Sequence, residues 1–99
     1  MEYVEIIRLR AAAGAPGQTI HRVAESVLGA EEPGLVSSRI YRGNRFQSDL
    51  AIHLHYQLDG DCGPREGLGI RVAAALEEYG LVDRALWVRV ERNENEEEV

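Results

Sequence analysis

The segment Ser48–Leu58, which reads SDLAIHLHYQL, decides the fold. Its apolar side chains fall on every second position, at Leu50, Ile52, Leu54, Tyr56 and Leu58. The positions between them are mostly polar and include His53 and His55. Alternation with a period of two is typical of a β-strand that is buried on one face. The segment is therefore predicted to be a strand whose two histidines share the face opposite its apolar residues.

Three other segments have strand character. Leu35–Arg42 lies directly before Ser48–Leu58, and the hairpin signal Gly43-Asn44 stands between them, so these two strands are predicted to pair antiparallel. Tyr3–Arg10 is rich in β-forming residues, and a last strand is predicted from Leu86 to Val90.

Helical periodicity fills the two long gaps between these strands. From about Gln18 to Gly29, and again from about Arg65 to Tyr79, apolar residues recur at spacings of three and four. The predicted order is βαββαβ. Because such crossovers are right-handed, this order gives a ferredoxin-like α+β fold, with a four-stranded antiparallel sheet and both helices on one face.

The length and charge of the chain limit what the protein can be. Its 99 residues are enough for one domain, which we assign to residues 1–92, and residues 93–99 are predicted to be an acidic disordered tail. A net charge of −6 argues against a nucleic-acid partner. No segment approaches the ~20 apolar residues of a membrane span, and no signal-peptide pattern is present. A cytoplasmic protein with no membrane partner is therefore expected.

Helices on one face leave the other face of the sheet open. The side chains expected to face the helices are Val36, Ile40, the five apolar residues of Ser48–Leu58, Leu86, Val88 and Val90. The open face then receives Ser37, Arg39, Tyr41, Ala51, His53, His55, Trp87 and Arg89. From the first strand it receives either Glu5, Ile7 and Leu9 or Ile6, Arg8 and Arg10, and the sequence does not decide between them. Such a patch predicts that a second copy of the chain covers it in a homodimer.

The layout also resembles a known family. The βαββαβ order, the arginine-rich first strand, the turn at Pro33-Gly34 and the stretch Gly80–Trp87 are similar to the dimeric α-β barrel superfamily, and within it to antibiotic biosynthesis monooxygenase-like proteins. The resemblance implies a barrel formed by two sheets. A ligand would lie between each sheet and its helices, or inside the barrel.

Two residue patterns of that superfamily are absent from this chain. Its cofactor-independent oxygenases use an asparagine on the first strand and a tryptophan near the end of the third. Here no asparagine precedes Asn44, and Tyr56 stands about where that tryptophan would be. Its haem-degrading members place a ligating histidine on the second helix, and residues 65–79 contain none. The resemblance turns Tyr56 toward a ligand, whereas alternation turns it toward the helices, and no cofactor is predicted.

The candidate site residues all belong to the open face. His53 and His55 are candidate catalytic bases or ligand contacts, a metal-binding pair, or interface histidines hydrogen-bonded across the dimer. A metal site usually needs a third ligand, which only Glu5 offers in one of the two registers, so no metal is assigned. Trp87, Tyr41, Arg39 and Arg89 are candidate ligand-binding residues, since rings stack on flat ligands and arginine binds anions. The alternative for Trp87, which we favour, is an anchor of the dimer interface, and for Arg39 and Arg89 it is ion pairs with carboxylates of the partner chain. Cys62 is the only cysteine and is expected to be a loop thiol without a catalytic role.

These observations favour a non-catalytic homodimer that binds a small molecule or has a structural role. The alternative is a cofactor-independent monooxygenase-like or isomerase-like enzyme that acts on an aromatic or polyketide-like small molecule. In that case His53 or His55 would be the base, and Trp87 and Tyr41 would be the walls of the site.

Overall fold

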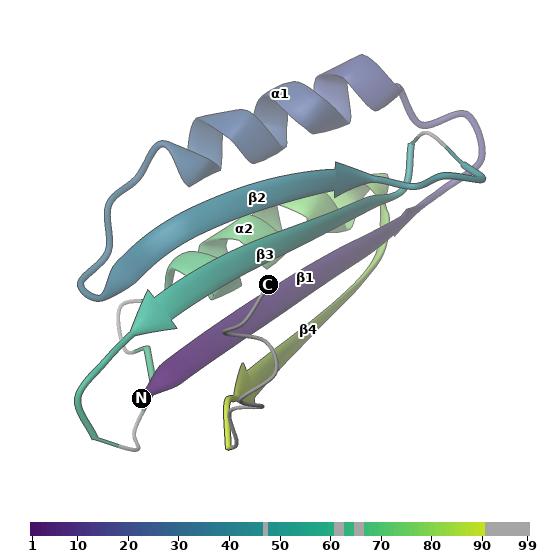
Figure 1. Ribbon diagram of the computed structural model, residues 1–99. Helices are drawn as coiled ribbons and strands as arrows, with labels where there is room; N and C mark the ends of the chain where they lie inside the picture. The colour runs from purple at the N-terminus through teal and green to yellow at the C-terminus, as the bar shows by residue number, and fades with distance from the viewer. Residues whose placement is uncertain (47, 61–62, 65–66, 91–99) are drawn as a thin grey trace.

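The computed structural model describes residues 1–46, 48–60, 63–64 and 67–90. Within them the elements follow the predicted order βαββαβ (Figure 1). They are β1 (Glu2–Ala11), α1 (Gly17–Leu28), β2 (Leu35–Arg42), β3 (Leu50–Gln57), α2 (Leu68–Leu76) with a 3-10 turn (Glu77–Tyr79), and β4 (Gly80–Val88). The predicted tail at residues 93–99 and the loop thiol of Cys62 lie outside the described residues.

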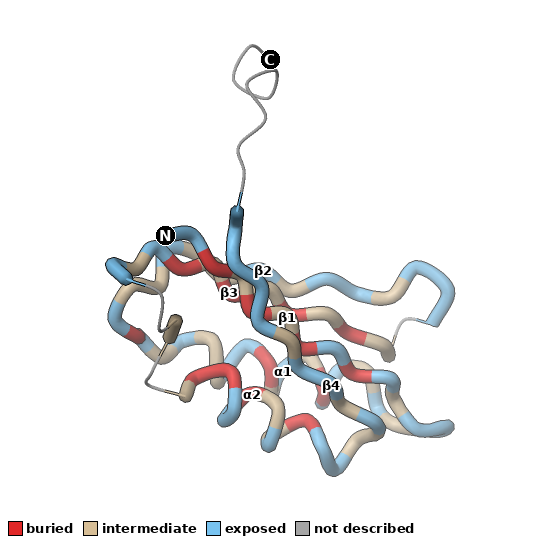
Figure 2. Tube along the Cα trace, turned by 90° about the horizontal axis from the view of Figure 1, so that it is seen from below, coloured by how far each residue is buried: buried red, intermediate tan, exposed pale blue. Residues whose placement is uncertain are grey.

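The strands form one antiparallel sheet in the order β2-β3-β1-β4. Both helices lie against the same face of this sheet, as Figure 1 shows and as the view from below in Figure 2 repeats. The ferredoxin-like fold is therefore confirmed. No helix in the described part of the chain is long and apolar enough to cross a membrane.

The pairing of β1 with β3 decides which side chains enter the core. Ile7 stands opposite Ile52, and both are fully buried under the helices. Since neighbouring residues of a strand alternate between faces, Tyr3, Glu5 and Leu9 also face the helices and are buried. Ile6, Arg8 and Arg10 therefore lie on the open face, which answers the question that the sequence left undecided.

Three expectations about the strands were wrong in detail. Val36 is 69% exposed, because the register shifts between Leu35 and Ser37 and leaves Val36 as the extra residue of a bulge. Val90 lies beyond the end of β4 and is 89% exposed. The last strand also begins at Gly80 rather than near Leu86, because its first residues pair with the C-terminal end of β1.

Helix α2 approaches the sheet closely at Gly69. A Cβ atom at this position would overlap the carboxylate of Glu5, which is 4% exposed and points at the helix from β1. The absence of a side chain at Gly69 therefore lets the helix pass directly over a buried acid.

We predict that Gly69→Ala destabilises the protein by about 2 kcal/mol, because the new methyl group must displace the Glu5 carboxylate. Helix propensity alone predicts the opposite sign, a gain of about 1 kcal/mol. Gly17→Ala is the control, since Gly17 also lies in a helix but has open space around its Cβ position. Urea unfolding of both variants measures the effect, and a stabilised Gly69→Ala variant would contradict the close approach.

Candidate functional site

The open face of the sheet has a regular arrangement of side chains that follows from the strand register. Three rows cross it from β2 to β4. They are Ser37-His55-Val4-Trp87, Arg39-His53-Ile6-Ala85 and Tyr41-Ala51-Arg8-Asp83. Five of the six candidate site residues thus lie on one face, as predicted, and Arg89 follows just beyond the end of β4, where its backbone N–H donates to the carbonyl of Glu2.

His53 lies at the centre of a small group of rings and charges. Its imidazole is 4.7 Å from the ring of Tyr41 and 6.2 Å from that of His55, measured between ring centroids. Partial burial, and then the charges of His55 and Arg39, hold the pKa of His53 below its ordinary value of 6.5. The imidazole is therefore neutral at neutral pH, with a nitrogen lone pair that can accept a proton or bind a ligand.

The open face is hollowed at both ends. One hollow of about 420 Å³ is lined by Glu2, Tyr3, Val4, His55, Trp87, Val88 and Arg89. A second, of about 440 Å³, lies at the other end, where Tyr41 meets Arg8 and Arg10 from β1 and Leu81 from β4. Both volumes fall within the range of small-molecule sites. The candidate residues are thus divided between the ends, with His53 and Arg39 in the row between them.

Two arginines of this face, Arg8 and Arg89, form ion pairs with carboxylates of the same chain. Arg89 contacts Glu2 at 3.0 Å, and Arg8 contacts Asp83 at 2.6 Å. An anionic ligand would therefore compete with Glu2 for Arg89. Arg8 and Arg10, which line the second hollow, were missed as site residues because the pattern of the first strand fits either face equally well.

Glu5, the third metal ligand that the sequence allowed, is not available to the histidines. Glu5 lies on the opposite face from the histidines and forms an ion pair with Arg84 of β4. Among the described residues, no group of three or more histidine, cysteine, aspartate or glutamate side chains could hold a metal ion within one chain.

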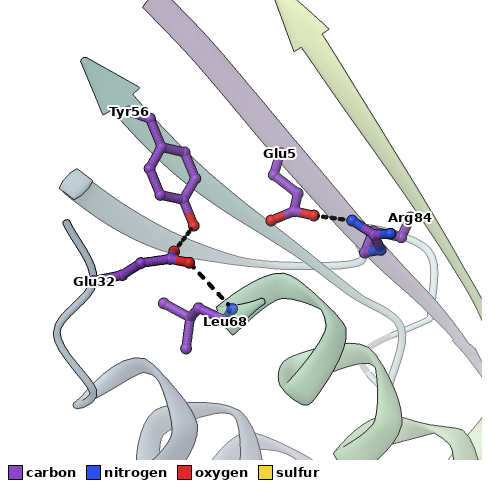
Figure 3. A network of polar contacts seen from close by, with 5 residues as sticks. All are labelled: Glu5, Glu32, Tyr56, Leu68 and Arg84. Carbon is purple, nitrogen blue, oxygen red and sulfur yellow. Dashed lines mark hydrogen bonds and ion pairs between the residues drawn. The ribbon is translucent and has the colours of Figure 1, made fainter. Parts of the chain in front are cut away.

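The other face of the sheet holds a buried polar network (Figure 3). The Tyr56 hydroxyl donates a hydrogen bond to Glu32, and the backbone N–H of Leu68 donates to the second oxygen of Glu32 at 3.3 Å. Burial, and then the hydrogen bond to Glu32, raise the pKa of Tyr56. Alternation therefore placed Tyr56 correctly, toward the helices.

This network is closed by the protein's own groups. Every buried side-chain nitrogen and oxygen in the described part of the chain has a hydrogen-bond partner. Glu32, which is 7% exposed, was not predicted, because it lies in a segment with the composition of a turn. Glu32 belongs to the loop before β2 and accepts a hydrogen bond from the first backbone N–H of α2. Because Glu32 also binds Tyr56 of β3, the network connects this helix to the sheet. We therefore assign it a structural role.

Comparisons with known proteins agree with this architecture. No family model and no curated protein matches the sequence. Among solved structures, the chain is similar to Rv0793 from Mycobacterium tuberculosis, with a TM-score of 0.67 and 14% identity over 93% of this chain and 98% of the other. It is also similar to a variant of SnoaB, a cofactor-independent oxygenase from Streptomyces nogalater, with a TM-score of 0.69 and 14% identity over 92% and 95% of the two chains.

A third similar structure is a candidate antibiotic biosynthesis monooxygenase from Chloroflexus aurantiacus. Its TM-score is 0.63 at 12% identity, over 94% of this chain and 97% of the other. The resemblance inferred from the sequence is therefore confirmed as a shared fold that spans nearly the whole chain. At identities this low the likeness concerns the fold alone.

We predict that Arg84→Met costs about 3 kcal/mol of unfolding free energy, because it leaves the buried carboxylate of Glu5 without its cation. Arg8→Met is the matched control. It removes the arginine of another β1–β4 ion pair, whose side chains are 67% and 57% exposed, and should cost less than about 1 kcal/mol. Chemical denaturation measures both, and equal losses would show that Glu5 is not held as described.

We also predict that His53 titrates below 6.5 in the metal-free protein and that Arg39→Gln raises its pKa toward that value. The reason is that Arg39 stands opposite His53 and disfavours a second positive charge there. NMR titration of the imidazole protons measures both values. A His53 pKa that does not change in Arg39→Gln would refute this electrostatic coupling.

Proposed function

We propose that the protein acts as a two-fold homodimer, joined through its open sheet faces, that binds a small molecule between them without transforming it. The observation that supports this most strongly is the exposure of Trp87. Its side chain lies on a regular strand and is 60% exposed in the single chain, and Tyr41 and Leu81 on the same face are 44% and 76% exposed. Rings exposed on one face of a sheet are typical of an interface.

The size of the face fits a second copy of the chain. Four strands spaced about 4.8 Å apart, with about eight residues each, cover roughly 520 Å² before side-chain relief is counted. Each partner in a stable complex of standard size buries about 800 Å² of accessible surface. The carboxylates of Glu2 and Asp83 are already paired with arginines of the same face, so burying this face leaves neither carboxylate unpaired.

The hollow between Trp87 and His55 is the part of the face best suited to a ligand. Its lining includes Val4, His55 and Trp87 from the open face, together with Arg89 and the Glu2 that pairs with it. Such walls fit a flat molecule, and an arginine fits an anionic group on it. A second copy laid over the open face would cover the His55 and Trp87 side of this hollow.

Catalysis is the second candidate. The observation in its favour is that His53 is neutral and lies against Tyr41, which would suit a base that removes a proton from a bound aromatic molecule. SnoaB, which shares the fold, is described as a cofactor-independent oxygenase. The chain lacks the first-strand asparagine of such enzymes, and its buried network beneath the sheet is satisfied internally, so we rank binding above catalysis.

Replacing Trp87 with arginine should convert the dimer into a monomer in sedimentation velocity at micromolar concentration, because it places a charge in the proposed interface. Ile70→Arg is the matched control. Ile70 lies on α2, on the opposite side of the sheet, and its exposure of 58% is close to that of Trp87. A wild-type monomer, or equal dissociation of both variants, would contradict pairing through the open face.

A flat aromatic anion such as 2-naphthoate should quench the fluorescence of Trp87, the only tryptophan of the chain. Arg89→Gln should weaken this binding roughly tenfold, because it removes a charge-assisted hydrogen bond to the carboxylate. Arg22→Gln, on the exposed side of α1, should leave it unchanged. Mass spectrometry of the recovered probe should show no change. An oxygenated product that disappears with His53→Gln would establish catalysis instead.

A further inference from the structure

The two histidines of β3 have the spacing of a metal-binding pair. His53 and His55 lie two residues apart on one strand, project from the same face and have ring centroids 6.2 Å apart. Two imidazoles bound to one tetrahedral zinc ion, with Zn–N distances of about 2.0 Å, have centroids about 5 Å apart. A small rotation of either ring closes this difference. One chain thus offers two ligands of the four that such an ion takes.

The position of His53 in the sheet suggests where the other two ligands come from. The rows of the open face place His53 and Ile6 side by side on the two inner strands, in the middle row. When two identical faces pack with maximal overlap, their two-fold axis lies in the plane between the sheets and crosses the centre of the face, so residues close to this axis meet their own copies. His53 lies about half a strand spacing from that centre, so the two copies of His53 are offset sideways by no more than about 5 Å.

The distance between the sheets is compatible with shared ligation. Sheets that pack face to face lie about 10 Å apart, and an imidazole extends about half of that distance from its strand. With the two-fold axis running along the strands, each histidine stays at the same level as its own copy, so the two copies of His53 and of His55 converge on one region between the sheets. We infer that this region binds one transition-metal ion, of the zinc or cobalt class, through four imidazoles from the two chains. This inference rests on the proposed dimer, because the site is incomplete without the second copy.

The surroundings of the histidines influence such a site in two ways. Val4, Ile6 and Ala51 flank them and keep the site largely apolar, which favours neutral imidazole ligands. Arg39 opposes the metal, since it stands directly opposite His53 on β2. Removing its charge should therefore tighten metal binding by about fivefold.

Titration of the purified protein with zinc chloride, and with cobalt chloride for its visible absorption, tests the inference. We expect one ion per two chains, with the intense absorption of tetrahedral cobalt. His53→Gln and His55→Gln should each weaken binding at least tenfold. His21→Gln is the matched control, because it removes the remaining histidine of the chain, which lies on α1. Cys62→Ser should also leave binding unchanged, and Arg39→Gln should strengthen it.

Sedimentation of the same samples separates this inference from the proposed dimer. Three results would overturn the metal site but not the dimer. They are a dimer that binds neither metal, a dimer that binds one ion per chain, and a His53→Gln dimer that binds metal as tightly as the wild type. A chain that is monomeric both with and without metal overturns the dimer, and the shared site with it. Loss of binding in His21→Gln would place the metal elsewhere and would also overturn the inference.

Discussion

The antiparallel pairing of β1 with β3 sets which side chains of the sheet enter the core and which lie on its open face. Placing Ile7 opposite Ile52 turns one set of β1 side chains toward the helices and the other set away from them. A slip of one residue would exchange the two sets, and would bring Glu5 to the histidines and Arg8 into the core. The same register lines up His53 with Ile6 and Arg39 in the middle of the open face.

The two faces of the sheet consequently have different chemistry. Beneath the helices, apolar side chains surround two buried acids, and each acid has its partner: Arg84 for Glu5, and Tyr56 with the N-terminus of α2 for Glu32. This side is closed and stabilises the fold. On the open face, Trp87 and Tyr41 remain exposed, His53 is neutral, and two hollows lie at the ends of the sheet. For this reason we propose that the function belongs to the open face.

The sequence predicted those features that depend on local periodicity. The period-two pattern of Ser48–Leu58 gave β3, the common face of His53 and His55, and the burial of Tyr56, even where the family resemblance pointed the other way. The orientation of β1 was not predictable, because apolar residues occur on both of its faces and only pairing with a neighbour distinguishes them. The bulge at Val36 and the burial of Glu32 depend on contacts distant in sequence, with β3 and with α2 respectively.

In the proposed dimer a second copy of the chain covers the open face. Because the protein has a single tryptophan and it lies on this face, its accessibility to acrylamide can be followed while the protein is diluted and its mass is measured by sedimentation. Pairing through this face predicts that Trp87 is protected from quenching wherever the dimer predominates and becomes accessible as the mass falls to that of one chain. A dimer in which Trp87 is quenched as readily as in the monomer would contradict it.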